Sequence, residues 1–106
     1  MNKKQIFDII VNSTASVCGV SAEAIKGTSR NADVVDARCM AFRYALSKEV
    51  GFTPRDIATL LGRDDLKAIR TLSRSYQDRY DRSFCFRRLA AFLREEISRG
   101  GVFSNG

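Results

Sequence analysis

The amino-acid sequence predicts an all-α fold, a single helical domain of about five to six helices. Apolar residues recur every three or four positions through most of the chain, which is the period of an amphipathic helix. No stretch alternates apolar and polar residues long enough to indicate a strand, and only one proline interrupts the pattern. A length of 106 residues fits one domain. We place it at residues 1–99 and expect a flexible, glycine-rich tail at residues 100–106.

The first half of the chain is predicted to be mostly helical. The first helix spans residues 2–18, and a second, short helix spans residues 21–26. The stretch GTSRNAD at residues 27–33 is polar and weakly periodic, so we expect a loop that exposes Arg30. Residues 33–50 form a long helix whose wide apolar face predicts the buried centre of a bundle. The residues expected to cap or end these helices are Asn2, Gly19, Ser21, Gly27 and Gly51.

The segment from Thr53 to Gly62 has the signals of a short, well-capped helix. Thr53 is a favourable N-cap, Pro54 occupies the first helical position, and Asp56 stands at the capping-box position. Gly62 permits the left-handed backbone that ends a helix sharply. The next helix is therefore expected to begin within a few residues of Gly62.

The helix that follows has an apolar face and a basic face. We expect Asp64 or Asp65 to cap it, and its apolar pattern continues to about Tyr80. Its apolar positions are Leu66, Ile69, Leu72, Tyr76 and Tyr80, and its basic positions are Lys67, Arg70 and Arg74. A capped short helix, a glycine turn and a basic amphipathic helix together predict a helix-turn-helix. The last predicted helix begins after Ser83 and extends to about Ile97.

The composition favours an anionic partner. The formal net charge is +6 and the isoelectric point is about 9.7. Residues 51–106 hold 11 basic and seven acidic side chains, so most of the excess lies in the half with the predicted helix-turn-helix. Nucleic acid is the first candidate and an anionic membrane surface the second, while an ordinary solvated surface is the plain alternative.

Several classes of protein are disfavoured. No apolar run approaches the roughly 18 residues of a membrane span, and the N-terminal stretch is too polar for a signal peptide. We therefore expect a cytoplasmic protein without a membrane partner. The three cysteines, Cys18, Cys39 and Cys85, lack metal-ligand spacing and are expected to be small buried hydrophobes. Histidine is absent, so we predict no enzyme, no metal, no cofactor and no small-molecule substrate.

Two segments of the sequence resemble a known family. They are SRNADVVDARCMA at residues 29–41 and the Gly-Arg-Asp of residues 62–64. With the helices placed around them, residues 3–97 resemble the C-terminal DNA-binding domain of DnaA, the bacterial replication initiator. The resemblance implies a fold of the Trp-repressor-like helix-turn-helix class, binding of double-stranded DNA, and a role in regulating replication or transcription.

The resemblance also implies roles for individual residues. Arg30 matches a loop arginine that enters the minor groove, and Arg38 matches an arginine on the long helix that meets the DNA backbone. Thr53 matches a cap residue that touches phosphate. Arg63 and Asp64 match the Arg-Asp of the family signature, which sits at the major groove.

The rest of that signature differs. The family's His-Thr-Thr is replaced here by Asp65, Leu66 and Lys67, which implies a site preference different from the usual DnaA box. Lys67, Arg70 and Arg74 are expected to lie along phosphates, where each contact releases counterions and makes binding salt-dependent. A solvated helix face is the alternative interpretation of these three cations.

Three of the charged residues could instead have purely structural roles. Arg63 could pair with Asp64, whose carboxylate could serve only as a helix cap, and Arg38 could pair with Asp36 or Glu49. The alternative function is a protein-interaction module that keeps the fold but has lost base readout. Aromatic residues near the C-terminus would then form a contact surface for a partner or for a homodimer, namely Phe84, Phe86, Phe92 and Phe103.

Overall fold

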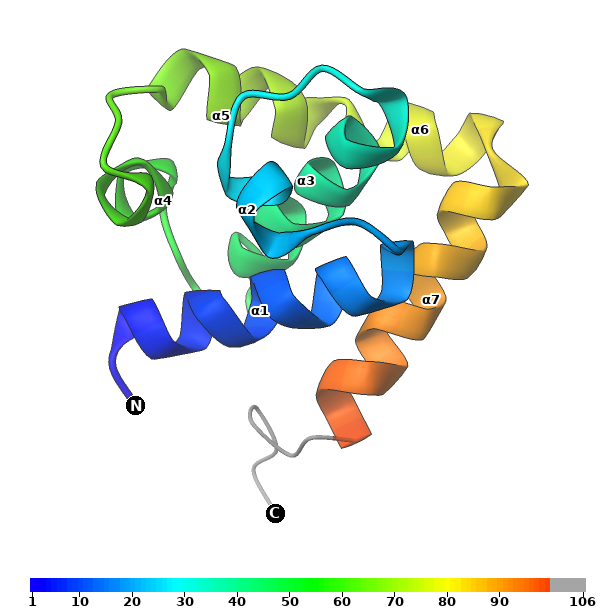
Figure 1. The fold of residues 1–106 in the computed structure, drawn as a ribbon, viewed down its shortest axis with the longest axis horizontal. Helices are drawn as coiled ribbons and strands as arrows, with labels where there is room; N and C mark the ends of the chain where they lie inside the picture. Colours follow the sequence, from blue (N-terminus) through cyan, green and yellow to red (C-terminus); the bar gives the residue numbers. More distant parts are fainter. Residues whose placement is uncertain (100–106) are drawn as a thin grey trace.

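The structure, a computed structural model, describes residues 1–99, and in that range it contains helices and no strand (Figure 1). The helices are α1 (Lys3–Cys18), α2 (Ala22–Lys26), α3 (Ala32–Ala45), α4 (Pro54–Leu61), α5 (Leu66–Arg74), α6 (Tyr76–Arg82) and α7 (Phe84–Arg99). The predicted all-α class is confirmed. The tail predicted at residues 100–106 lies outside the described residues. No helix up to Arg99 combines the length and apolarity that a membrane span requires.

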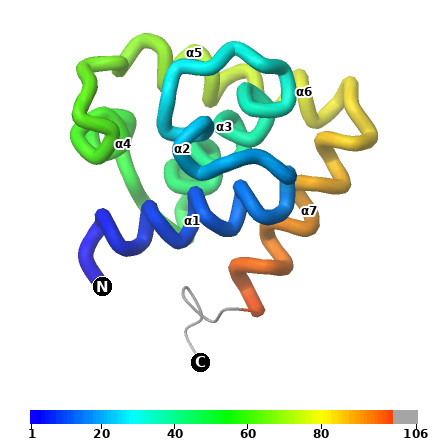
Figure 2. Tube along the Cα trace, viewed as in Figure 1, coloured from blue at the N-terminus to red at the C-terminus, as the bar shows by residue number. Residues whose placement is uncertain are grey.

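Helix α3 forms the centre of the domain. It contacts α1, α2, α5 and α6, and half of its residues are buried, as its wide apolar face predicted. Ala37, Ala41 and Ala45 are fully buried, and their small side chains let neighbouring helices approach closely. Figure 2 shows the chain between α2 and α3 rising to the level of α5 before it turns into α3. This path brings residues 27–31 beside the basic helix.

Local hydrogen bonds set most of the helix ends as predicted. The side chain of Asn2 accepts from the Gln5 N–H, and that of Ser21 accepts from the Ala24 N–H. Gly19 has a φ of 70° and ends α1 with its N–H bonded to the Ala15 carbonyl. Because these signals lie within three or four residues of each other, the sequence alone identifies them.

The prediction of a long helix at residues 33–50 is wrong at both ends. Asn31 caps α3, which begins at Ala32, and the helix stops at Ala45. The chain reverses after it because Phe52 must enter the core, where it is 6% exposed. The Phe52 N–H donates to the Ala45 carbonyl at 2.9 Å. Gly51, with a φ of 79°, supplies the left-handed residue that this reversal requires.

The helix predicted to continue to about Tyr80 is divided at Ser75 into α5 and α6. The hydroxyl of Ser75 donates to the Leu72 carbonyl at 2.6 Å and accepts from Nε of Arg79 at 3.0 Å. Counted as one element, α5 and α6 make up the fifth of the six predicted helices. The break directs α6 toward α7, which it contacts through the ring of Tyr76.

Helix α7 buries one apolar face and leaves two aromatic rings exposed. Phe86, Ala90, Leu93 and Ile97 are buried, so Phe86 belongs to the core and not to a contact surface as predicted. Phe84 and Phe92 are 64% and 46% exposed. Phe103 lies outside the described residues. Cys85, expected to be buried, is exposed, whereas Cys39 is buried and Cys18 is partly buried.

Candidate functional site

Helix α4, the turn after it and α5 form a continuous unit on the surface. The side chains of Thr53 and Asp56 make the predicted capping box at the start of α4, and Gly62, with a φ of 71°, ends it. Ile57 of α4 and Ile69 of α5 are buried, at 0% and 1% exposure. Because Ile69 is held in the core, the opposite face of α5 is turned to solvent (Figure 1).

That exposed face of α5 carries Lys67, Arg70 and Arg74. Their spacing of three and four residues places them on neighbouring turns of one side of the helix. Within residues 1–99, no carboxylate lies at ion-pair distance from any of them, nor from Arg30 in the loop before α3. All four charges are therefore available to an anion from outside.

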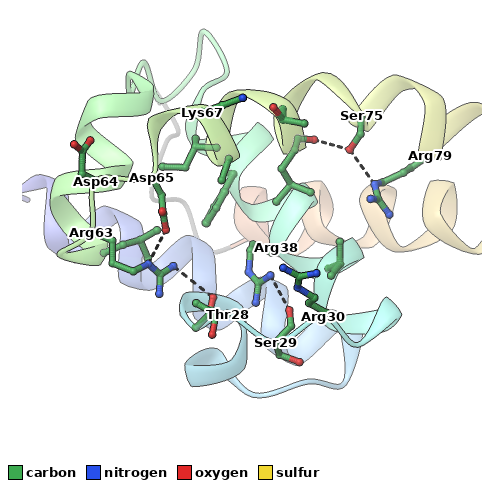
Figure 3. A pocket seen from close by; sticks show the side chains of 18 residues that line it. Thr28, Ser29, Arg30, Arg38, Arg63, Asp64, Asp65, Lys67, Ser75 and Arg79 are labelled. Atoms are coloured by element: carbon green, nitrogen blue, oxygen red, sulfur yellow. Dashed lines mark hydrogen bonds and ion pairs between the residues drawn. The ribbon is translucent and has the colours of Figure 1, made fainter.

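A groove with a volume of about 700 Å³ separates α5 from the loop before α3. We call it the α5 groove. It is lined by residues 27–30, by side chains of α3 and α5, and by Arg63 and Asp64 of the turn. Figure 3 shows Arg30 on the loop side of the groove and Lys67 on the α5 side. Two of the unpaired cations, Arg30 and Lys67, thus line the same groove.

Arg38 crosses beneath the loop and is held by backbone carbonyls. It donates from Nε to Ile25 at 2.8 Å, from Nη2 to Ala24 at 2.8 Å and from Nη1 to Ser29 at 2.9 Å. Burial lowers the pKa of Arg38 from its ordinary value, and the charge of Arg63 acts in the same direction. The guanidinium therefore fastens the end of α2 and the loop to α3, and most of its N–H groups are already engaged.

The ion pairs predicted as alternatives for Arg38 are wrong. Asp36 pairs with Arg79 of α6, their Oδ1 and Nη1 atoms 2.6 Å apart, and Glu49 lies 3.9 Å from Arg94 of α7. Arg38 points from α3 toward the carbonyls at the end of α2 instead. A sequence does not reveal backbone acceptors of this kind, because folding brings them into reach.

Arg63 joins the turn to the loop. Its Nε lies 2.9 Å from Oδ2 of Asp65, and its Nη2 donates to the Gly27 carbonyl at 3.4 Å (Figure 3). The pairing predicted as an alternative, with Asp64, is wrong by one residue. Asp65 occupies the N-cap position of α5, as one of the two predicted alternatives, but its carboxylate is paired with Arg63 and makes no cap hydrogen bond to the helix.

The structure therefore brings together only part of the predicted site. Arg30, Arg38, Arg63, Asp64 and Lys67 line the α5 groove. Arg70 and Arg74 lie on the exposed face of α5 but outside the groove lining, and Thr53 lies at the far end of α4, where its hydroxyl accepts from the Asp56 N–H at 3.1 Å.

Sequence reasoning missed Arg79, which also lines the groove. Its bonds to Asp36 and Ser75 tie α6 to α3 beside the groove. No signal in the sequence indicated this, since Asp36 and Arg79 are 43 positions apart. The break at Ser75 also places Arg79 where a continuous helix would not.

The site offers no metal centre among residues 1–99, where no group of three or more potential ligands gathers. No protein-family model matches this chain, and no curated protein matches it either. The resemblance to DnaA therefore stays a prediction. The arrangement of charges and the groove are the basis for a functional proposal.

Proposed function

We propose that this protein binds double-stranded DNA through a helix-turn-helix formed by α4 and α5. The observation that carries the proposal is the exposed row of unpaired cations on α5, with Arg30 across the groove from Lys67. A basic helix whose other face is fixed in the core suits the major groove of DNA. Neutralised phosphates release counterions, which would supply much of the affinity.

The loop and α5 would contact adjacent grooves of the duplex. With α5 in the major groove and Arg30 in the neighbouring minor groove, the sugar-phosphate strand between them would cross the α5 groove. Lys67 and Arg63 line that path. Arg38 would act there chiefly by holding the loop in place, since its N–H groups already bind carbonyls.

Two carboxylates would influence which DNA sequence the protein prefers. Asp64 is exposed and would repel phosphate, yet it can accept a hydrogen bond from a cytosine amino group. Asp65 is paired with Arg63. We infer a site preference unlike that of the DnaA box, and a role for this protein in regulating replication or transcription in the cytoplasm.

Fluorescence anisotropy tests the proposal with three labelled duplexes, which are a DnaA box, a scrambled box and a random pool. Each duplex is titrated at several salt concentrations with the wild-type protein and with Lys67→Ala and Arg70→Ala. Lys48→Ala is the matched control, because Lys48 is also an exposed lysine but does not line the α5 groove.

We expect binding that weakens steeply as salt rises. Each α5 variant should lower the log–log salt slope by about one, since each removes one phosphate contact, while Lys48→Ala leaves it unchanged. Sequences enriched from the random pool would define the preferred site. Absence of binding to every duplex near ~50 mM salt, where phosphate contacts are strongest, would overturn the proposal.

A second candidate function is the protein-interaction module, and one observation favours it. Phe84 and Phe92 are exposed on α7, and the Arg88 guanidinium lies over both rings, 5.9 and 5.5 Å from their centroids. Sedimentation velocity of the wild type and of Phe84→Ser/Phe92→Ser tests whether this surface forms a homodimer. A dimer that is lost in the variant supports it, and a monomer at every concentration rejects it.

A further inference from the structure

We propose that the α5 groove is also a binding site for a small amphipathic anion, a molecule with a compact apolar body and one carboxylate, phosphate or sulfonate group. We further infer that this ligand, once bound, excludes the DNA strand, and this second part rests on the proposed function. The ligand would act as an effector of DNA binding and not as a substrate.

The floor of the groove is apolar. Val35 of α3, Leu61 of α4 and Leu72 of α5 line it and are only partly buried, and Ala68 is exposed. An apolar body seated there would remove this side-chain surface from water. A volume of about 700 Å³ falls in the range of small-molecule sites.

The rim of the groove is cationic. Five basic side chains line it, against the two carboxylates of Asp64 and Asp65. Those that already bind protein atoms are Arg38, Arg63 and Arg79. Arg30 and Lys67 have no carboxylate partner in the described part of the chain, and Figure 3 places them on opposite sides. An anionic group between them would complement both charges.

DNA alone does not account for the apolar floor. A sugar-phosphate strand takes its contacts from cations, hydroxyls and N–H groups. The side chains of Val35, Leu61 and Leu72 offer none of these. A ligand with an apolar part and an anionic part matches the floor and the rim together.

The two ligands would compete for the same residues. An anion between the loop and α5 would engage Arg30 and Lys67 and fill the path that the strand takes between the two grooves of DNA. Each ligand would therefore weaken the binding of the other, and thermodynamic linkage makes the two effects equal in size.

The probe for this site is 8-anilinonaphthalene-1-sulfonate, an aromatic sulfonate whose fluorescence rises in apolar surroundings. It is titrated into the full chain without DNA, while amide and methyl NMR spectra locate it. We expect saturable binding, with shifts concentrated at residues 27–30, at Val35 and at residues 68–72. These segments come together at the α5 groove.

Variants separate this site from the apolar surface of α7. Ala68→Trp should fill the groove and abolish binding. Arg30→Ala removes an exposed loop cation and should weaken binding by about threefold to tenfold, whereas Lys48→Ala should bind as the wild type does. Circular dichroism confirms that each variant is folded, so that a loss of signal reports on the groove.

The outcomes are distinct. Fluorescence that survives Ala68→Trp and Arg30→Ala but vanishes in Phe84→Ser/Phe92→Ser would place the probe on α7 and overturn the proposal. With the probe in the groove, it should release a bound duplex; a duplex that stays bound at saturating probe overturns the exclusion. A protein that binds the probe but no duplex refutes the proposed function and still supports the ligand site.

Discussion

The Nε atom of Arg63 lies 2.9 Å from the Oδ2 atom of Asp65, two residues further along the same turn. The pair stands at the entrance to α5, where the proposed DNA contact begins. The carboxylate of Asp65 neutralises the charge of Arg63. Replacing Asp65 by an uncharged residue would leave the Arg63 guanidinium without this partner at the surface. In the proposed complex, the pair would therefore oppose DNA binding while it stabilises the turn.

Asp65→Asn should tighten DNA binding by about two- to fivefold at low salt, the scale of an exposed ion pair. The change removes a negative charge and frees Arg63 for phosphate. Anisotropy with the random duplex pool measures the effect. Glu96→Gln is the control, because Glu96 is an exposed acid on α7, away from the groove. An unchanged affinity for Asp65→Asn would mean that Arg63 does not meet DNA.

Arg38→Ala should destabilise the fold by about 2 kcal/mol or more, because three carbonyls lose a charged donor. Arg38→Lys should recover only part of the loss, since a single ammonium cannot replace the planar fork of donors. Urea unfolding followed by circular dichroism gives the free energies. Arg55→Ala on the exposed side of α4 serves as control, and an equal loss there would contradict the assigned role of Arg38.

The stability of the start of α4 should depend on pH through Asp56. Its pKa is held below the ordinary value by the Thr53 N–H, which donates to the carboxylate at 2.9 Å, and by Lys3 Nζ, also at 2.9 Å. Because the pKa of Asp56 is lower in the folded protein than in the unfolded chain, its carboxylate stabilises the fold fully at pH values above the unfolded-state pKa. This stabilisation is lost as the pH falls through the folded-state pKa. The contribution is thus largest at neutral pH.

Asp56→Asn should therefore lower Tm at neutral pH, and the gap from the wild type should close as pH falls below about 4. Calorimetric scans of both proteins from about pH 7 to about pH 2 measure the gap. A difference that stays constant across this range would show that the charge of Asp56 is not what stabilises the cap.

The three thiols should differ in reactivity. Cys85 is exposed and Cys39 is buried. Burial, together with Asp36 and Asp33, raises the pKa of Cys18 to about 11, and burial also raises the pKa of Cys39. Because the thiolate is the reactive form, iodoacetamide at about pH 8 should label Cys85 alone in the native protein.

Intact-protein mass spectrometry counts the labels on each sample. Cys85→Ser should take up none until urea is added, when the remaining two thiols become accessible. Labelling of Cys18 or Cys39 as fast as Cys85 would show that the packing around α1 and α3 opens under native conditions.

The helix ends that could be predicted from the sequence are set by local bonds. Asn2, Ser21 and Thr53 each accept from the backbone N–H three residues further on, and Gly19 and Gly62 adopt the left-handed conformation. The prediction failed where packing between distant segments decides. The burial of Phe52 ends α3 at Ala45, and the packing of Tyr76 on Phe86 accompanies the break at Ser75.

The candidate site shows the same contrast between features set by local sequence and features set by contacts between distant segments. The helical period alone separates the exposed face of α5, with Lys67, Arg70 and Arg74, from its apolar face, so that face could be predicted. The partners of Arg38 and Arg63 could not, because carbonyls of α2 and of the following loop reach them only in the folded chain. The α5 groove had no signal in the sequence for the same reason.

The break at Ser75 leaves α5 only nine residues long. At 1.5 Å per residue its axis covers roughly 13 Å, the rise of about four base pairs. A sequence of four base pairs recurs by chance about once in every 250 base pairs, far too often to mark one place on a chromosome. In the proposed complex, a protein that binds as a single molecule would therefore find binding sites at many loci. Binding at one unique locus would require several molecules bound at adjacent, regularly spaced sites.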